Sequence, residues 1–194
     1  ASHIISDSIV LQRYPSIIST AILGPNKTGD IVITTGHLDM VDGIVAADTF
    51  SSGKAGNITV NANTANLTAG ASITSNTFAN GEGGNVNLTI TDTLVITGQR
   101  VGRIVSPLGM VVDNAQSYVG SMAFGKGHAG NIFISAATLN MNQAGGITTI
   151  TVGEGDAGNV TIDVNDLQVT KGSGIGSNNN VKVGEQMRVG SGKS

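Results

Sequence analysis

The sequence predicts an all-β chain folded as a right-handed parallel β-helix, with about 28 residues per coil and three short strands in each coil. Three observations predict it: a repeated Gly-Asp/Asn-Ile/Val block, alternating apolar residues at fixed distances from that block, and an unusual composition. The 194 residues include 28 Gly, no Cys and no Trp, and only 12% are charged. Average domains carry about twice that charge. Since 39% of the residues are apolar, the composition favours short packed strands between tight turns over disorder.

The repeated block sets the length of the coil. Its successive copies are separated by 27, 28, 46 and 28 residues. The copies are Gly29-Asp30-Ile31, Gly56-Asn57-Ile58, Gly84-Asn85-Val86, Gly130-Asn131-Ile132 and Gly158-Asn159-Val160. The longest spacing equals one repeat with 18 additional residues, which we assign to an insertion at about 102–119. A repeat of this kind is the signature of a solenoid.

Apolar residues keep the same phase in every repeat and alternate with polar ones. Each repeat therefore reads as three short strands of period two, and no segment has a helical apolar period of useful length. We expect the apolar residues to point inward and to form columns through the stack. The expected column members are Ile58, Val60, Leu67 and Ile73 in one coil and Ile132, Ile134, Met141 and Ile147 in another.

Stacking of successive coils follows from the energetics of one repeat. Three strands in about 28 residues bury only one row of side chains each, so they become stable when like strands lie side by side, about 4.8 Å apart. Propeller blades need about 40 or more residues per unit. We also expect a structural ladder at the turn before the first strand, in which side chains bond to the adjacent coils. Its members are Asp30, Asn57, Asn85, Asn131 and Asn159. The Gly before each of them suggests a positive φ at that corner.

The domain organisation is a single β-helix segment over residues 1–194. It comprises a partial coil at 1–26, repeats that start near residues 27, 53, 81, 127 and 155, and the insertion. Residues 9–17 match 167–175, and Met187-Arg188-Val189 has the phase of a further coil. No atypical polar cap is evident, so we expect a fragment of a longer protein whose ends can self-associate end to end.

Two stretches carry a family resemblance. Residues 53–60 (GKAGNITV) and 67–78 (LTAGASITSNTF) resemble the shaft repeats of filamentous-haemagglutinin-like large exoproteins of the two-partner secretion family. The resemblance covers residues 9–178 but not the secretion domain of that family. It implies a secreted or cell-surface β-helical rod that is exported through an outer-membrane transporter. It further implies a role in adhesion or aggregation through a host or neighbouring-cell surface or carbohydrate. No functional residue can be carried over, because shaft repeats vary freely.

The insertion is the one interruption of the repeat, and it is the candidate contact loop. Its neighbourhood contains Arg100, Arg103, Asp113 and Tyr118, and loops on a rigid scaffold commonly carry binding. There are two alternatives without a binding role: a tolerated surface loop and a partial extra coil. Of these two, we favour the loop. The strand before the insertion is also displaced by one residue, so that Leu94 and Ile96 take the inward phase.

Catalytic, metal and cofactor sites are not expected, so the chain is not predicted to be an enzyme. Some β-helices act on carbohydrates, but glycoside hydrolysis needs carboxylates within roughly 5–9.5 Å. Asp39 and Asp42 lie four coils from Asp163 and Asp166 in the predicted stack. Glu82, Glu154 and Asp156 share an edge that basic residues interrupt, and no calcium-binding nonapeptide is present.

Nucleic acid is not an expected partner, because the net charge is −3 and no cluster of Lys and Arg is present. The few aromatic residues are read as scattered. No apolar run reaches the ~18 residues of a membrane span. The predicted function is therefore the structural shaft of a secreted adhesin. The alternatives are a self-assembling filament subunit and a carbohydrate-active enzyme of the same fold.

Overall fold

The computed structural model describes residues 2–12, 16–100, 103–105, 111–113 and 115–179, and every regular element in these ranges is a β-strand. The strands are β1 (Ser2–Gln12), β2 (Ile17–Ile22), β3 (Ile31–Val41), β4 (Ile44–Thr49), β5 (Ile58–Thr68), β6 (Ser72–Thr77), β7 (Val86–Ile90), β8 (Thr93–Thr97), β9 (Arg103–Val105), β10 (Val111–Asp113), β11 (Tyr118–Ala123), β12 (Ile132–Asn142), β13 (Gly146–Thr151), β14 (Val160–Val169) and β15 (Gly174–Asn179). The predicted Met187-Arg188-Val189 strand lies outside the described residues.

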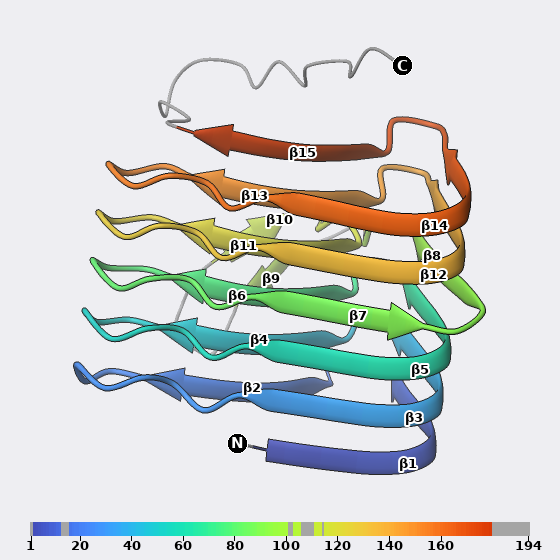
Figure 1. Ribbon diagram of the computed structural model, residues 1–194, viewed down its shortest axis with the longest axis horizontal. Coiled ribbons are helices and arrows are strands. Elements are labelled where there is room, and N and C mark those ends of the chain that lie inside the picture. The colour runs from blue at the N-terminus through green and yellow to red at the C-terminus, as the bar shows by residue number, and fades with distance from the viewer. Residues whose placement is uncertain (1, 13–15, 101–102, 106–110, 114, 180–194) are drawn as a thin grey trace.

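The strands form a stack of coils that rises from β1 to β15 (Figure 1). One sheet has the order β1-β3-β5-β7-β12-β14, with β8 beside β5 and β12, and the other has the order β15-β13-β11-β6-β4-β2. All pairs within these two sheets are parallel, and Ile58 pairs with Val86 while Ile132 pairs with Val160. The chain is therefore a parallel β-solenoid with about 28 residues per turn, as the repeat predicts.

The first two predicted strands of a coil are usually one continuous strand that bends. In β5 the residues from Ile58 to Ala62 alternate in burial, then Asn63 and Thr64 both face outward, and alternation resumes at Ala65. The backbone pairing with the adjacent coils continues on both sides of this bend. Strands β7 and β8 are separate, because one additional residue lies in the bend at Thr91 and Asp92.

The core consists of the predicted inward columns. All eight residues that we named for the two coils are at most 2% exposed: Ile58, Val60, Leu67, Ile73, Ile132, Ile134, Met141 and Ile147. The core prediction is confirmed. Full burial of one such side chain is worth roughly 1.5–3 kcal/mol before the conformational entropy of ordering the chain is subtracted.

The insertion lies a few residues earlier than we predicted. Thr97 still pairs with Thr68 and Asn142, and Tyr118 already pairs with Ser72 and Gly146. The additional residues therefore leave the coil after Gly98 and return before Ser117. The predicted range of 102–119 is wrong at both ends, because an apolar phase marks strands but not the exact point at which a turn is extended.

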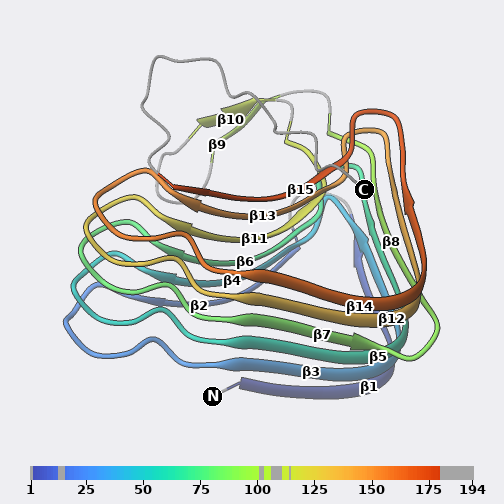
Figure 2. The ribbon, with the colours of Figure 1, turned by 45° about the horizontal axis from the view of Figure 1, so that its top comes forward.

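The inserted hairpin β9–β10 lies on the outer side of the sheet that contains β6 and β11 (Figures 1 and 2). On β6 the outward residues Ser72, Thr74 and Asn76 are as buried as the inward ones, with at most 7% exposed. This sheet is therefore buried on both faces near β6. In a solenoid without an insertion, the outer face of the sheet would be exposed to solvent.

Three of the four phenylalanines stack at one corner. The rings of Phe50 and Phe78 lie 4.7 Å apart with 3° between their planes, and those of Phe78 and Phe124 lie 5.1 Å apart with 4° between planes. The prediction that the aromatic residues are scattered is wrong for these three, because each follows the short strand of its own coil. Offset aromatic stacking adds about 0.5–1.5 kcal/mol per pair.

Candidate functional site

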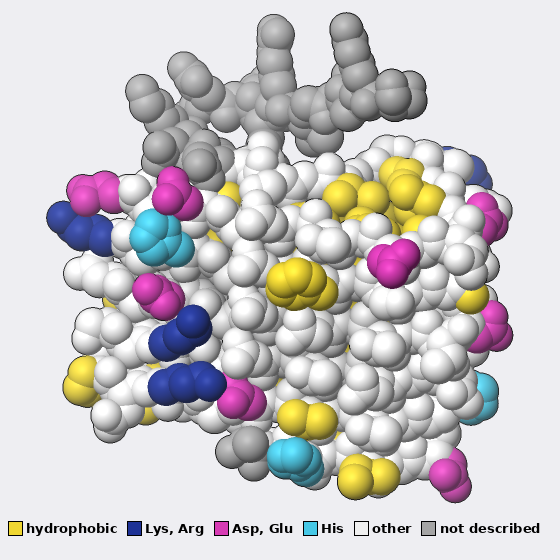
Figure 3. All heavy atoms as spheres, viewed as in Figure 1, with side chains coloured by type: hydrophobic (Ala, Val, Ile, Leu, Met, Phe, Trp, Pro, Cys, Tyr) yellow, Lys and Arg dark blue, Asp and Glu magenta, His cyan; other side chains and the backbone are white. Residues whose placement is uncertain are grey.

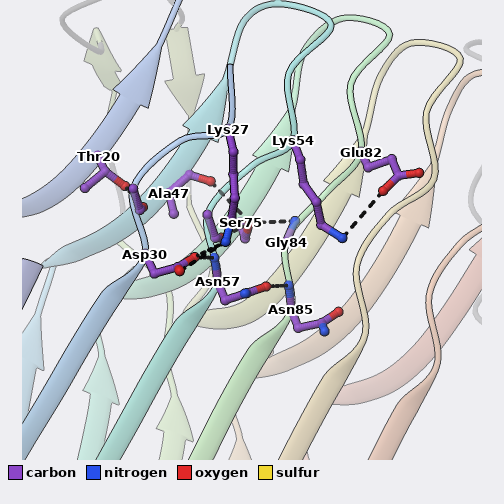
Figure 4. A network of polar contacts seen from close by, with 12 residues as sticks. Thr20, Lys27, Asp30, Ala47, Lys54, Asn57, Ser75, Glu82, Gly84 and Asn85 are labelled. Carbon is purple, nitrogen blue, oxygen red and sulfur yellow. Dashed lines mark hydrogen bonds and ion pairs between the residues drawn. The ribbon is translucent and has the colours of Figure 1, made fainter. Parts of the chain in front are cut away.

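The ladder residues form a continuous hydrogen-bonded chain at the corner before the long strands, and Figure 4 shows its first three members, Asp30, Asn57 and Asn85. In each case a side-chain oxygen accepts the backbone N–H of the equivalent residue one coil further on. The bonds run from Asn57 N to Asp30 Oδ1 (2.7 Å), Asn85 N to Asn57 Oδ1 (2.9 Å), Asn131 N to Asn85 Oδ1 (2.9 Å) and Asn159 N to Asn131 Oδ1 (2.8 Å). Because Asn85 and Asn131 bond directly across the insertion, the inserted residues loop out of the stack.

The first member of the ladder is ionised more readily than an ordinary Asp. Partial burial raises the pKa of Asp30, but hydrogen bonds from Lys27 and from the Asn57 N–H lower it by more, so the net shift is downward. Lys27 Nζ lies 2.9 Å from Asp30 Oδ1. The corner therefore accepts either a carboxylate or an amide, provided that an acceptor oxygen faces the next coil.

Removal of one ladder acceptor should destabilise the stack. We expect Asn85→Ala to lower the free energy of unfolding by about 1–3 kcal/mol, because the partly buried N–H of Asn131 loses its acceptor. Asn85→Asp retains an acceptor, as Asp30 does, and should cost less. Asn165→Ala, at an exposed position of β14, is the control. Equal effects of Asn85→Ala and Asn165→Ala in urea unfolding would contradict a structural ladder.

The glycines before the ladder residues are required by close approach of the backbone. A Cβ on Gly84 would lie 2.1 Å from the Gly56 carbonyl oxygen, and a Cβ on Gly130 would lie 2.0 Å from that of Gly84. The prediction of a positive φ here is wrong: within the described ranges the positive-φ glycines are Gly70, Gly98 and Gly172, at a different corner. Stacked coils leave no space for a side chain at these positions.

Buried serine hydroxyl groups of the short strands form hydrogen bonds with the backbone of this corner. Ser75 donates to the Gly56 carbonyl (2.8 Å) and accepts the Gly84 N–H (3.0 Å). Ser121 accepts the Gly130 N–H (2.8 Å) in the same way. We did not predict these contacts, although serine or threonine at one repeat phase was visible in the sequence.

Charged side chains along the same corner neutralise one another. Lys54 lies 3.5 Å from Glu82, and Lys126 lies 3.3 Å from Glu154. His128 also contacts Asp156, but there its Nδ1 accepts the Asp156 backbone N–H at 2.9 Å. Figure 3 shows basic and acidic side chains together at the left edge of the molecule. In the part of the chain that the structure describes, no group of three or more His, Asp or Glu could hold a metal ion.

The carboxylates weighed for glycoside chemistry make separate local contacts. Asp39 Oδ1 accepts the Asn66 amide at 2.6 Å, and Asp42 pairs with Arg100. Asp163 and Asp166 lie on β14, four strands further along the sheet from β3, which corresponds to about 20 Å.

The four predicted contact-loop residues have different places. Arg100 Nη1 donates to Asp42 Oδ1 at 2.6 Å with only 15% of its side chain exposed, so it closes the base of the insertion. Arg103 and Asp113 are paired opposite each other across the hairpin β9–β10. Tyr118 is the first residue of β11, within the coil and not in the loop. The structure therefore does not gather these four residues into one surface.

A largely but not fully buried carboxyl group, that of Asp48, lies near Tyr118 and was not predicted. Burial raises the pKa of Asp48 to about 6, against opposing hydrogen bonds from the Asn76 backbone and side chain. Burial also raises the pKa of Tyr118 to about 12, and the charge of Asp48 contributes. Sequence reasoning missed the burial of Asp48, because its position faces outward in the repeat.

A groove follows the corner between the long strands and the short strands. It has an open volume of about 580 Å³ and crosses four successive coils. Its lining is Thr68, Ala69, Thr97, Gly98, Gln99, Gln143, Ala144 and Lys171. The groove passes the point at which the chain leaves the stack, where Gln99 bridges Gln116 at the base of the insertion.

Comparison with known proteins leaves the family open. No protein-family model matches the chain, and no curated protein and no solved structure matches it either. The fold thus rests on the repeat and on the structure.

Within the described ranges, no helix has the length and apolar character to cross a bilayer.

Proposed function

We propose that this chain is a structural shaft segment of a secreted bacterial surface protein that mediates adhesion or aggregation. The observation that carries the proposal is the identity of the contacts between coils. The four interfaces from the coil of β3 to the coil of β14 repeat the same inward columns, the same kind of ladder bond and the same glycine approach, so coils can be added without changing the contact. A protein built this way grows in one direction, which suits a rod that holds a binding region away from a cell.

The resemblance of residues 53–60 and 67–78 to filamentous-haemagglutinin-like repeats supports export and surface localisation. By that resemblance, an outer-membrane transporter is the partner during export, and a cell surface or carbohydrate is the later partner. A core assembled from local, repeated contacts suits a chain that folds after export, since each coil needs only its neighbour.

Cell fractionation of the source bacterium tests the proposal. Antibodies raised against residues 16–179 should detect the parent protein at the cell surface or in the medium, and deletion of its gene should reduce adherence or aggregation. Detection only in the cytoplasm, with adherence unchanged, would refute the proposal.

A filament subunit is the second candidate, and the repetition of one contact between coils favours it. The ladder bond between Asn85 and Asn131 has the same form as the bond between Asn131 and Asn159. A coil of a second copy can take the place of the next coil, which gives a contact that propagates. Light scattering over a wide concentration range distinguishes the candidates: growth with concentration supports the filament, and a constant monomer mass opposes it.

A further inference from the structure

We propose that Asn80 is a site of spontaneous deamidation in the folded chain, and that its isoaspartate product separates the coils at this corner. Asn80 precedes Gly81 in the bend between β6 and the ladder residue Asn85. Among the 194 residues, Asn is followed by Gly only here. The site goes beyond the proposed surface function and does not depend on it, because the reaction needs only the chain and water.

The reaction joins two neighbouring groups of the main chain and side chain. The Gly81 backbone nitrogen loses its proton to hydroxide and attacks the Asn80 side-chain carbon Cγ, which forms a five-membered succinimide. The Cγ–Nδ2 bond breaks, and the side-chain nitrogen takes a proton from water and leaves as ammonia. Water then opens the ring at one of its two carbonyl carbons. Cleavage of the new bond to Cγ gives aspartate, whereas cleavage of the original peptide bond gives isoaspartate. Attack within one chain gains from the proximity of the two groups.

The local structure leaves this reaction open at Asn80. The Asn80 side chain is exposed, so water and hydroxide reach it. In the described part of the chain, no hydrogen bond holds the Gly81 N–H, and Gly81 has no side chain to obstruct ring closure. The Lys126 N–H of the next coil donates a long hydrogen bond of 3.4 Å to Asn80 Oδ1. A donor in this place stabilises the charge that develops on a carbonyl oxygen under attack.

The ladder asparagines are closed to the same reaction. The Ile58 N–H, which follows Asn57, donates to the Asn85 carbonyl oxygen at 2.9 Å. The Val86 N–H, which follows Asn85, donates to the Asn131 carbonyl oxygen at 2.9 Å. The nucleophile that each ring closure needs is therefore already bonded, and a β-branched side chain stands beside it. These asparagines are internal controls for Asn80.

The isoaspartate product lengthens the main chain, which then runs through the Cβ of residue 80 and gains one carbon atom. The stack has no space for a longer chain at this corner. A Cβ built on Gly81 would clash with the Gly53 carbonyl oxygen, and a Cβ built on Gly127 would clash with the Gly81 carbonyl oxygen. We therefore expect the corner that contains isoaspartate to move away from the coils on both sides.

Two backbone hydrogen bonds report this separation. The Ala55 N–H donates to the Glu82 carbonyl oxygen at 2.7 Å, and the Gly83 N–H donates to the His128 carbonyl oxygen at 2.8 Å. We expect the Ala55 and Gly83 amides to lose protection from hydrogen exchange as isoaspartate accumulates. The Ala129 N–H, at the same corner one coil further on, should keep its protection.

Incubation of the purified 194-residue chain at pH 8 and 37 °C tests the proposal, with deamidation located by mass spectrometry of peptic digests. We expect Asn80 to convert while Asn57 and Asn85 remain amides. Asn80→Gln is the matched variant: it keeps an exposed amide, but its ring closure would need a six-membered ring, so conversion at this position should be lost. The same incubation in urea shows the reaction of the unfolded chain.

Each outcome decides a stated part of the proposal. Conversion of Asn80 in the folded chain, with faster exchange at Ala55 and Gly83, supports it. An Asn80 amide that survives in the folded chain but reacts in urea would mean that the packing of Gly81 closes the site, and the proposal would be overturned. Conversion spread evenly over Asn80 and the ladder asparagines would overturn it as well. Isoaspartate at residue 80 with unchanged exchange would refute the separation of the coils.

Discussion

Gly130→Ala should be among the most destabilising single methyl additions in this chain. The new Cβ would lie 2.0 Å from the Gly84 carbonyl oxygen and 2.4 Å from the Gly84 carbonyl carbon, both in backbone that is itself held in the stack. Overpacking against atoms that can yield typically costs 1–3 kcal/mol. Here the coils must separate locally, so we expect a loss of about 3 kcal/mol or more in the free energy of unfolding.

Gly24→Ala provides the matched control for this experiment. Nothing lies within 4 Å of a Cβ built at Gly24, so we expect a change of less than about 0.5 kcal/mol. Urea unfolding of both variants gives the comparison. A Gly130→Ala protein as stable as the Gly24→Ala protein would mean that the coils are not stacked as closely as described.

Stability should fall as the pH rises through the titration of Asp48. The pKa of this carboxyl is about 6 in the folded chain, above its ordinary value of 3.8, because burial favours the neutral form. The folded chain therefore binds this proton more tightly than the unfolded chain does. The resulting contribution to the free energy of unfolding is fully present below about pH 3.8 and is lost as the pH rises through 6. The pKa shift corresponds to about 3 kcal/mol. We expect the free energy of unfolding to be lower by this amount at pH 7.5 than at pH 3.8.

Asp48→Asn should abolish this dependence. The substituted amide keeps an oxygen that accepts from the Asn76 backbone and side chain, but it carries no charge to bury. We expect the variant to be more stable than the natural chain at pH 7.5, by up to about 3 kcal/mol. Asp163→Asn, on the exposed outer side of β14, serves as the control. The experiment measures unfolding free energies at pH 4 and 7.5, and an unchanged pH profile in Asp48→Asn would contradict the burial.

Much of the fold could be predicted from the sequence, because each coil repeats one pattern of inward residues. The eight named core residues are buried, and the ladder residues Asp30 to Asn159 meet as their common phase requires. The one-residue displacement of Leu94 and Ile96 was also visible, and the structure places its cause in the bend at Thr91 and Asp92.

Other features depend on contacts that a linear pattern does not contain. The glycine before each ladder residue could be read as a need for positive φ, but only the stacked backbone reveals the carbonyl oxygen about 2 Å from its Cβ. Asp48 is largely buried because its sheet is covered on both faces near β6. The repeat phase alone predicts that the position of Asp48 is exposed.

The candidate contact residues show the same difference. Composition near the insertion suggested one loop surface, whereas Arg100 closes the base and Tyr118 belongs to a strand. The groove was not predicted, because its lining comes from turns in four coils that the sequence separates. The stacked phenylalanines, by contrast, could have been found, since Phe50, Phe78 and Phe124 share one repeat phase.

The central claim is that the coils stack in register across the insertion, and one engineered disulfide tests it most directly. Thr89 pairs with Ser135, and the natural chain contains no cysteine. In a Thr89→Cys, Ser135→Cys variant, adjacent parallel strands place the two Cα atoms about 5 Å apart, within the range that a disulfide spans. We predict near-complete oxidation by mass spectrometry under non-reducing conditions, and little in Thr89→Cys, Asp163→Cys, whose sites lie two coils apart. If the insertion instead forms an extra coil, Thr89 and Ser135 lie about 10 Å apart, the first pair stays reduced, and the account is contradicted.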